Sequence, residues 1–220
     1  MLKSSTLKFL KDLKKNNNKP WFDQNRPAFD GAKSDFVSLV EEIIVAVARF
    51  DESIGELKAK DCTFRINRDV RFSKNKTPYK TNMAASFSKG GKKAMVAGYY
   101  FHCEPGQSFT GGGFYSPGPA ELSKIRQEID YNFDEWIAIL NEKKFKTLFN
   151  QGVETRDSLI RAPKGYDENN PAIVFLKMRE FIVTRPFDDQ AITGKNLVKE
   201  IARSFEAMKP MIGFLNRAIE

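Results

Sequence analysis

The most concentrated chemistry of this sequence lies in one stretch, RDVRFSKNKTPYKTN at residues 68–82, where cationic side chains recur every two to four residues. Arginine guanidinium groups bind carboxylate or phosphate as rigid forks, and lysines add mobile point charges. We therefore predict that this stretch binds an anionic ligand. The predicted binding residues are Arg68, Arg71, Lys74, Lys76 and Lys80.

The net charge of the chain has the same origin. Between Cys62 and Cys103 there are nine Lys and Arg but one acid, Asp69, whereas the remaining residues contain 27 cations and 27 acids. The whole formal charge of +8 therefore belongs to one segment. Such a run is either a solvated basic face or a surface that recruits phosphate, carboxylate or nucleic acid.

Arg68 separates a structural role of this segment from a binding role. On a straight strand it would share the apolar face and would need a partner, because an unpaired buried charge is costly. Its neighbour Asp69 would point to the opposite face, so the two could pair only across a turn or bulge. An internal Arg and Asp network that ties down the loop is thus the alternative to ligand binding.

A second candidate element is the stretch FTGGGFYSPGP, in which Gly111, Gly112 and Gly113 precede an expected helix. Glycines let backbone N–H groups approach an anion, and a helix begins with a partial positive charge. The Lys and Ser or Thr of a Walker A loop are absent. If the strands form a meander, the glycines would share an anion pocket with the basic segment. The alternative is a bulge or tight bend leaving the sheet.

Signatures of catalysis are few. Asp69 and Tyr79 are weak candidates for proton transfer in an enzyme acting on a small anionic substrate. His102 stands among alternating aromatic residues and is interpreted as a core or edge residue rather than a base. Nothing in the sequence requires a metal or another cofactor, and whether the protein is an enzyme stays open.

Three classes of function therefore remain. The first is a module that binds a small anion or nucleic acid through the basic surface, with affinity that falls steeply with salt. No helix-turn-helix or zinc-finger pattern is present, and the residues 99–101 offer a stacking surface only in part, since alternation buries some of them. The second is the enzyme, and the third is a structural or partner-binding protein with a solvated basic rim.

Hydrophobic periodicity places these residues on a central group of strands. Helical spacing covers most of the first ~50 residues, and from Cys62 to Phe72 the period changes to two. We expect an α+β fold in which an antiparallel meander, from about residue 62 to 114, is packed with N-terminal, middle and C-terminal helices. Later predicted strands are TNMAASFS, KAMVAGYYFHC, SFTGGGFY, DSLIRA and REFIVTRPF, and the last predicted helix begins near Gly194 or Asn196 and contains Pro210.

Composition sets the broad class. A chain of 220 residues with 41% hydrophobic residues can bury a substantial core, and without a linker or repeat it is expected to form a single domain over residues 1–220. Its two cysteines are too few for a disulfide framework. The N-terminus lacks a signal-peptide pattern and no apolar run could span a bilayer, which predicts a soluble, cytoplasmic protein without a membrane partner.

Four motifs resemble a known family. They are NNNKPWFDQNR, FRINRDVRFSKNKTPYKTN, GGGFYSP and APKGYDENNPA, and together they extend over nearly the whole chain. The sequence resembles the bacterial and fungal family called domain of unknown function 2461. The resemblance implies a single domain, and it supplies no reaction, cofactor or catalytic residue to carry over.

Overall fold

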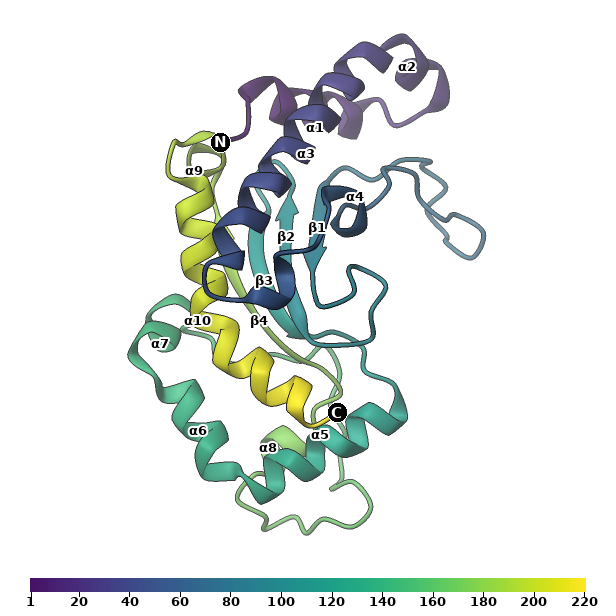
Figure 1. The fold of residues 1–220 in the computed structure, drawn as a ribbon. Coiled ribbons are helices and arrows are strands. Elements are labelled where there is room, and N and C mark those ends of the chain that lie inside the picture. Colours follow the sequence, from purple (N-terminus) through teal and green to yellow (C-terminus); the bar gives the residue numbers. More distant parts are fainter.

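The computed structural model describes residues 1–220, which form ten α-helices, a short 3-10 helix and one four-stranded sheet (Figure 1). The helices are α1 (Ser4–Lys15), α2 (Lys19–Gln24), α3 (Arg26–Ala48), η1 (Glu52–Ile54), α4 (Ala59–Cys62), α5 (Pro119–Tyr131), α6 (Phe133–Asn141), α7 (Lys143–Leu148), α8 (Ile173–Leu176), α9 (Asp189–Thr193) and α10 (Leu197–Arg217). The strands are β1 (Met83–Phe87), β2 (Gly98–Cys103), β3 (Ser108–Phe114) and β4 (Phe181–Phe187). The fold is therefore α+β, as the sequence predicts.

The sheet is antiparallel throughout and has the strand order β1-β2-β3-β4. Because successive side chains of a strand point to opposite faces, β2 divides into two sets. Tyr99, Phe101 and Cys103 are buried, whereas Tyr100 and His102 are half-buried. We call the face that carries Tyr100 and His102 the outer face of the sheet.

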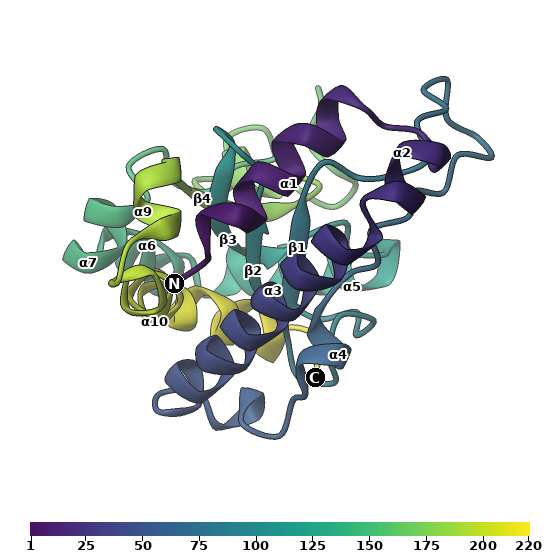
Figure 2. The same cartoon turned by 90° about the horizontal axis from the view of Figure 1, so that it is seen from above.

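Helices α3 and α10 cover the other, inner face. Phe36 of α3 stacks on Phe101 with ring centroids 6.2 Å apart, and Phe205 of α10 stacks on Tyr99 at 4.9 Å. The view from above shows both helices on the same side of the strands (Figure 2). These contacts belong to a core cluster of 48 buried residues.

The helices of the middle region gather around the C-terminal half of α10 (Figure 1). Trp136 of α6 lies at the centre of this group, 5.0 Å from Phe214 of α10 and 6.2 Å from Phe181 at the start of β4. Helix α10 itself continues through Pro210, and its axis changes direction along its length (Figure 1), as a helix containing proline is expected to do.

The prediction of a first strand from Cys62 to Phe72 is wrong. Cys62 ends helix α4, and the following residues make only isolated bridges, between Thr63 and Ala85 and between Asn67 and Tyr79. The apolar alternation does not correspond to alternating burial, because Phe72 is 95% exposed. The regular meander begins at Met83 and ends at Phe114, and these three strands are confirmed.

The prediction of a strand in DSLIRA is also wrong. This segment makes one isolated bridge, between Ser158 and Met178. The residue that pairs with the free edge of β4 is Glu154, whose backbone exchanges two hydrogen bonds with Ile182. Strand β4 and the C-terminal helix lie where the sequence predicts them.

Candidate functional site

The cationic residues of the central motif lie on a long loop that folds back on itself, residues 65–80, which we call the basic loop. Its two arms are joined by backbone hydrogen bonds from Arg68 to Pro78 at 2.9 Å and from Lys80 to Ile66 at 2.8 Å. The loop projects from the β1 edge of the sheet (Figure 1). At these positions the two arms thus bond to each other rather than to a neighbouring strand of the sheet.

The N-terminal region braces the basic loop at its base. Asn17 donates to the carbonyl oxygen of Tyr79 at 2.9 Å and accepts from its N–H at 3.1 Å. The ring of Tyr79 stacks on Phe22 of α2 with centroids 4.0 Å apart. The motifs NNNKPWF and KTPYK are therefore two halves of one packing unit, and Tyr79, a candidate proton donor in the sequence, is buried within it.

Arg68 points into the loop. Its guanidinium donates to the carbonyl oxygen of Thr77 at 3.2 Å, to the hydroxyl of the same residue at 2.5 Å and to the hydroxyl of Ser73 at 3.3 Å. It does not pair with Asp69. Neutral oxygens of the loop thus take the place of the acidic partner that the sequence suggests, and Arg68 ties the two arms together.

Asp69 is occupied by Arg71. The guanidinium Nε and Nη2 donate to the two carboxylate oxygens at 3.0 and 2.7 Å, a fork-to-fork arrangement. These hydrogen bonds lower the pKa of the Asp69 carboxyl, so Asp69 is ionised at neutral pH. The carboxylate therefore holds a cation in place, and both groups are exposed.

The three lysines of the loop differ in their surroundings. Lys74 is exposed, Lys76 is exposed and donates to the carbonyl oxygen of Val70 at 3.0 Å, and Lys80 is half-buried with its ammonium 5.4 Å from the centre of the Phe64 ring. Burial lowers the pKa of Lys80, and the charge of Arg65 adds to the shift. The lysines at the end of the loop are therefore exposed, whereas the lysine at its base is half-buried.

The remaining cations of the basic segment lie elsewhere. Lys89, Lys92 and Lys93 line an open hollow of about 620 Å³, and the acids Glu52, Glu56 and Asp61 line the same hollow. The acids balance these lysines in number. Within the basic segment, the cations outside this hollow are those of the basic loop.

The three glycines of β3 serve packing. A Cβ on Gly112 would lie 2.4 Å from the sulfur of Met208 in α10, and a Cβ on Gly113 would lie 1.9 Å from the carbonyl oxygen of Phe181. Gly113 also has a φ of 118°, which side chains rarely adopt. All three glycines, Gly111 included, are buried.

The structure does not bring the glycines and the basic loop together. The loop enters β1 at Met83, which is paired with Cys103 at the end of β2, whereas Gly113 is paired with Gly98 at the beginning of β2. The two elements therefore lie at opposite ends of the sheet. The joint anion pocket expected from the sequence is not formed.

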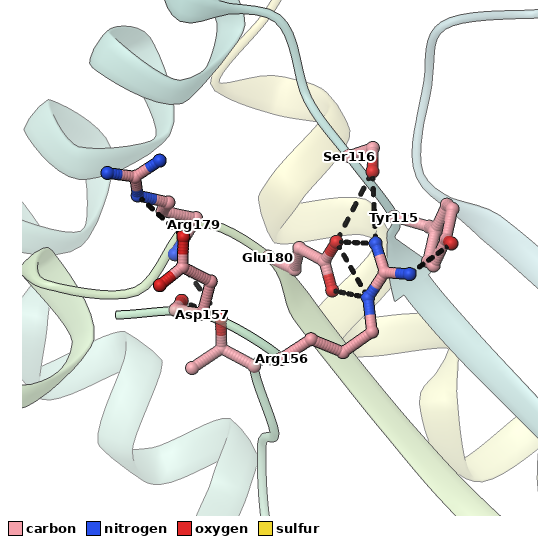
Figure 3. Close-up of polar contacts among 7 residues, drawn as sticks. Tyr115, Ser116, Arg156, Asp157, Arg179 and Glu180 are labelled. Atoms are coloured by element: carbon pink, nitrogen blue, oxygen red, sulfur yellow. Dashed lines mark hydrogen bonds and ion pairs between the residues drawn. The ribbon is translucent and has the colours of Figure 1, made fainter. Parts of the chain in front are cut away.

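A polar cluster that the sequence does not reveal lies at the glycine end of the sheet (Figure 3). Its centre is Glu180, which is 5% exposed and accepts two bonds from Nε of Arg156, at 2.9 and 3.1 Å, and a further one from Nη2. Ser116 donates to the same carboxylate at 3.2 Å, and the Tyr115 hydroxyl accepts from Arg156 at 2.5 Å. Hydrogen bonds from Arg156 lower the pKa of Glu180.

The residues of this cluster come from segments that are dozens of residues apart, so no local pattern of the sequence groups them. Tyr115 and Ser116 belong to the GGGFYSP motif, and Ser116 is the one non-glycine residue with a positive φ, 51°. Arg156 directly precedes the predicted strand DSLIRA, and Glu180 is the second residue of the predicted strand REFIVTRPF. A second pair, Arg179 and Asp157, stands beside them at 3.3 Å (Figure 3).

The single histidine belongs to a chain of polar groups on the outer face. Nδ1 of His102 lies 3.1 Å from the hydroxyl of Tyr100, and Nε2 lies 3.2 Å from a carboxylate oxygen of Glu104. Burial lowers the pKa of His102, and Glu104 opposes that shift in part. The residue is half-buried between two partners, at the edge of the core as the sequence suggests.

Other reactive groups are enclosed. Cys62 and Cys103 are buried free thiols, and burial raises their pKa to about 11 and about 12. No group of three His, Cys, Asp or Glu side chains is placed to hold a metal ion. None of the helices combines the length and the apolar character needed to cross a membrane.

Comparison with known proteins identifies one family. No match was found among curated proteins or among solved structures. One family does match, with the description conserved hypothetical protein (DUF2461), and the match covers residues 5–214. It includes all four motifs, from the Asn17 brace to the segment before β4. The chain therefore belongs to the DUF2461 family.

Proposed function

We propose that this protein binds phosphate-bearing ligands and that the basic loop is the binding element. One observation carries the proposal: most of the excess positive charge of the chain lies on a single projecting loop. The loop contains six cations and one acid, Asp69, which is already paired with Arg71. The cations are Arg65, Arg68, Arg71, Lys74, Lys76 and Lys80.

The form of the loop favours an extended polyanion over a small carboxylate. A small ligand is usually bound in a concave pocket that removes it from water. The charges of Arg71, Lys74 and Lys76 instead lie on an exposed, projecting segment, where several phosphates of one chain can contact several cations. Affinity then arises from the release of counterions and requires no enclosed site.

The bracing of the loop supports the same proposal. Arg68 links its arms, and Asn17 and Phe22 fix its base to the N-terminal helices. A loop held in one shape loses little conformational entropy when it binds. The structural role of Arg68 and the binding role of the lysines are thus complementary.

The test is fluorescence anisotropy with labelled inorganic polyphosphate and with a labelled single-stranded oligonucleotide, using citrate as a carboxylate competitor. Replacing Lys74 and Lys76 with Gln should weaken binding of both polymers by about tenfold at low salt. The matched control replaces Lys143 and Lys144 with Gln, which removes the same charge from exposed positions on α7. Equal losses in the two double variants, or no binding of either polymer, would overturn the proposal.

A further inference from the structure

Three exposed aromatic rings each carry a cation. Arg71 lies 5.7 Å from the ring of Phe72, Lys80 lies 5.4 Å from Phe64, and Arg156 lies 4.3 Å from Tyr115. These rings are 95%, 40% and 59% exposed, in that order. In the other aromatic–cation contacts of the chain the ring is buried, so the cation covers the core. The three exposed pairs have no such packing role.

Ring contacts lead from the base of the basic loop onto the outer face of the sheet. Phe72 is at the far end of the basic loop and Phe64 is at its base, where the Phe64 ring lies 6.4 Å from Tyr100 of β2. Tyr100 is in turn 5.7 Å from Phe109 of β3. Tyr115 follows directly after Phe114, the last residue of β3.

Gly111 adds no side chain to the outer face of the sheet between the rings. Gly111 stands opposite Tyr100 in the register and has no side chain to rise above the sheet. The ring of Phe109 lies against it, with carbon atoms 3.6 and 3.7 Å from the position of a Cβ. Aromatic rings therefore continue from Phe64, at the base of the basic loop, across β2 to β3.

We infer that the phosphate-bearing ligand is a single-stranded nucleic acid, whose bases stack on Phe72, Phe64 and Tyr115 while its phosphates contact the basic loop. The inference rests on the proposed function. Exposed aromatic rings interleaved with cations are the elements by which proteins bind single strands without reading sequence. Four-stranded antiparallel sheets with aromatic residues on one face bind single-stranded RNA in the same physical way.

The arrangement fits a single strand better than the other polyanions. Bases in a duplex are already stacked on one another, so their faces are not available to stack on exposed rings. Polyphosphate has no bases and would leave the rings unused. An anionic membrane would require apolar side chains gathered at one tip, whereas Phe72 stands between Arg71 and Ser73 and the other two rings lie away from the tip.

Two of the cations beside these rings are held in place by acids. Arg71 is held by Asp69 and Arg156 by Glu180, so both guanidinium groups keep their positions against their rings. Each guanidinium lies over one face of its ring, so the base is proposed to stack on the opposite face. Asp69 and Glu180 thus limit the movement of the two guanidinium groups. The exposed lysines of the loop, Lys74 and Lys76, supply the attraction for phosphate.

The deciding experiment compares an unstructured single-stranded oligonucleotide with an abasic oligomer of the same length, which has the same phosphates and no bases. Fluorescence anisotropy at low salt should give at least about tenfold tighter binding of the oligomer with bases. Phe72→Leu should remove about tenfold of that affinity and leave the abasic oligomer unaffected, whereas Phe72→Trp should restore it. Phe64→Leu should act in the same direction, whereas Tyr131→Leu, which removes an exposed ring at the end of helix α5, outside the proposed surface, should bind as the unaltered protein does.

Each alternative has its own outcome. Equal affinity for the two oligomers would overturn the single-strand inference and leave the proposed phosphate binding intact. Binding of neither oligomer, nor of polyphosphate, would overturn both. Tighter binding of a duplex, or binding only of vesicles that contain phosphatidylserine, would overturn the inference in favour of that partner. Because Phe72 is exposed, thermal melting of its variants should match that of the unaltered chain, which excludes misfolding as a cause.

Discussion

At the scale of single residues, His102 and Glu180 show how one fold imposes opposite demands on two ionisable groups. His102 is half-buried and lies between a phenol and a carboxylate, so burial opposes its charge. Glu180 is almost fully buried but receives several hydrogen bonds, so its charge is stabilised. The charge of His102 and the stabilisation by Glu180 are therefore expected to depend on pH in different ways.

His102 should titrate below the ordinary histidine pKa of about 6.5, because burial outweighs the attraction of Glu104. Glu104→Gln should lower the pKa of His102 further, since the carboxylate favours the charged imidazole. The chain has one histidine, so nuclear magnetic resonance of the imidazole protons measures this directly. A pKa of 6.5 or above in the unaltered chain would contradict the described burial.

Glu180→Gln should lower the free energy of unfolding at neutral pH by about 1–2 kcal/mol, less than for a fully enclosed pair because Arg156 can return to water. The folded-state pKa of Glu180 is depressed, so its stabilisation is complete above the unfolded value of about 4.3 and is lost as pH falls through the folded value.

The measurement is urea denaturation of both proteins between neutral pH and about pH 3, across the ordinary carboxyl pKa. The two stability curves should converge toward the acid end. Glu41→Gln, an exposed change on α3, is the control and should leave the curve unshifted. A constant difference at all pH values would show that the loss arises from packing rather than from charge.

At the scale of elements, the contacts between β3, β4 and α10 depend on the absence of side chains. Gly113→Ala should destabilise the protein by at least about 3 kcal/mol, because the new Cβ meets the backbone of Phe181 and the φ of 118° is strained. Gly31→Ala, on an open surface of helix α3, should instead stabilise by about 0.5–1 kcal/mol. Urea midpoints measure both changes, and a tolerated Gly113→Ala would refute the described register of β3.

The brace of the basic loop makes a second prediction at this scale. Asn17→Ala removes two hydrogen bonds to Tyr79 and should loosen the loop by about 1–2 kcal/mol. Hydrogen exchange followed by mass spectrometry should then be faster over residues 66–80, while the amides of β2 and β3 keep their protection. Asn141→Ala, at an exposed position at the end of α6, should change neither region. Uniformly faster exchange would instead identify the brace as part of the global core.

At the scale of the whole molecule, the distribution of charge sets the expected response to salt. For a single strand the logarithm of the binding constant should fall with the logarithm of salt concentration by about 0.7 per phosphate contact. Removing Lys74 and Lys76 should therefore reduce the slope by about 1.4, whereas removing Lys143 and Lys144 should leave it unchanged. Anisotropy titrations at several salt concentrations measure the slope, and equal slopes in the two double variants would place the contacts outside the basic loop.

The sequence alone determined what depends on local pattern. Short apolar runs between turn residues located β1, β2, β3 and β4, helical spacing located the C-terminal helix, and simple counting located the excess charge. Burial alternates along β2, because this strand has a neighbour on each side and one face against helices. The same information gave the α+β class and the family motifs.

Only the tertiary structure decided the rest. The pattern from Cys62 to Phe72 reads as a strand, yet the chain there pairs with its own second arm and leaves Phe72 in solvent. Residue 112 must be glycine because the sulfur of Met208 occupies the space of a Cβ, and Glu180 forms an ion pair with Arg156. Both pairs are far apart in the sequence, so no local periodicity reveals them. Periodicity indicates which face of a segment is apolar, but the packing of distant segments decides which partner covers that face. For this reason the candidate site lies on a projecting loop and not on a strand and a glycine bend.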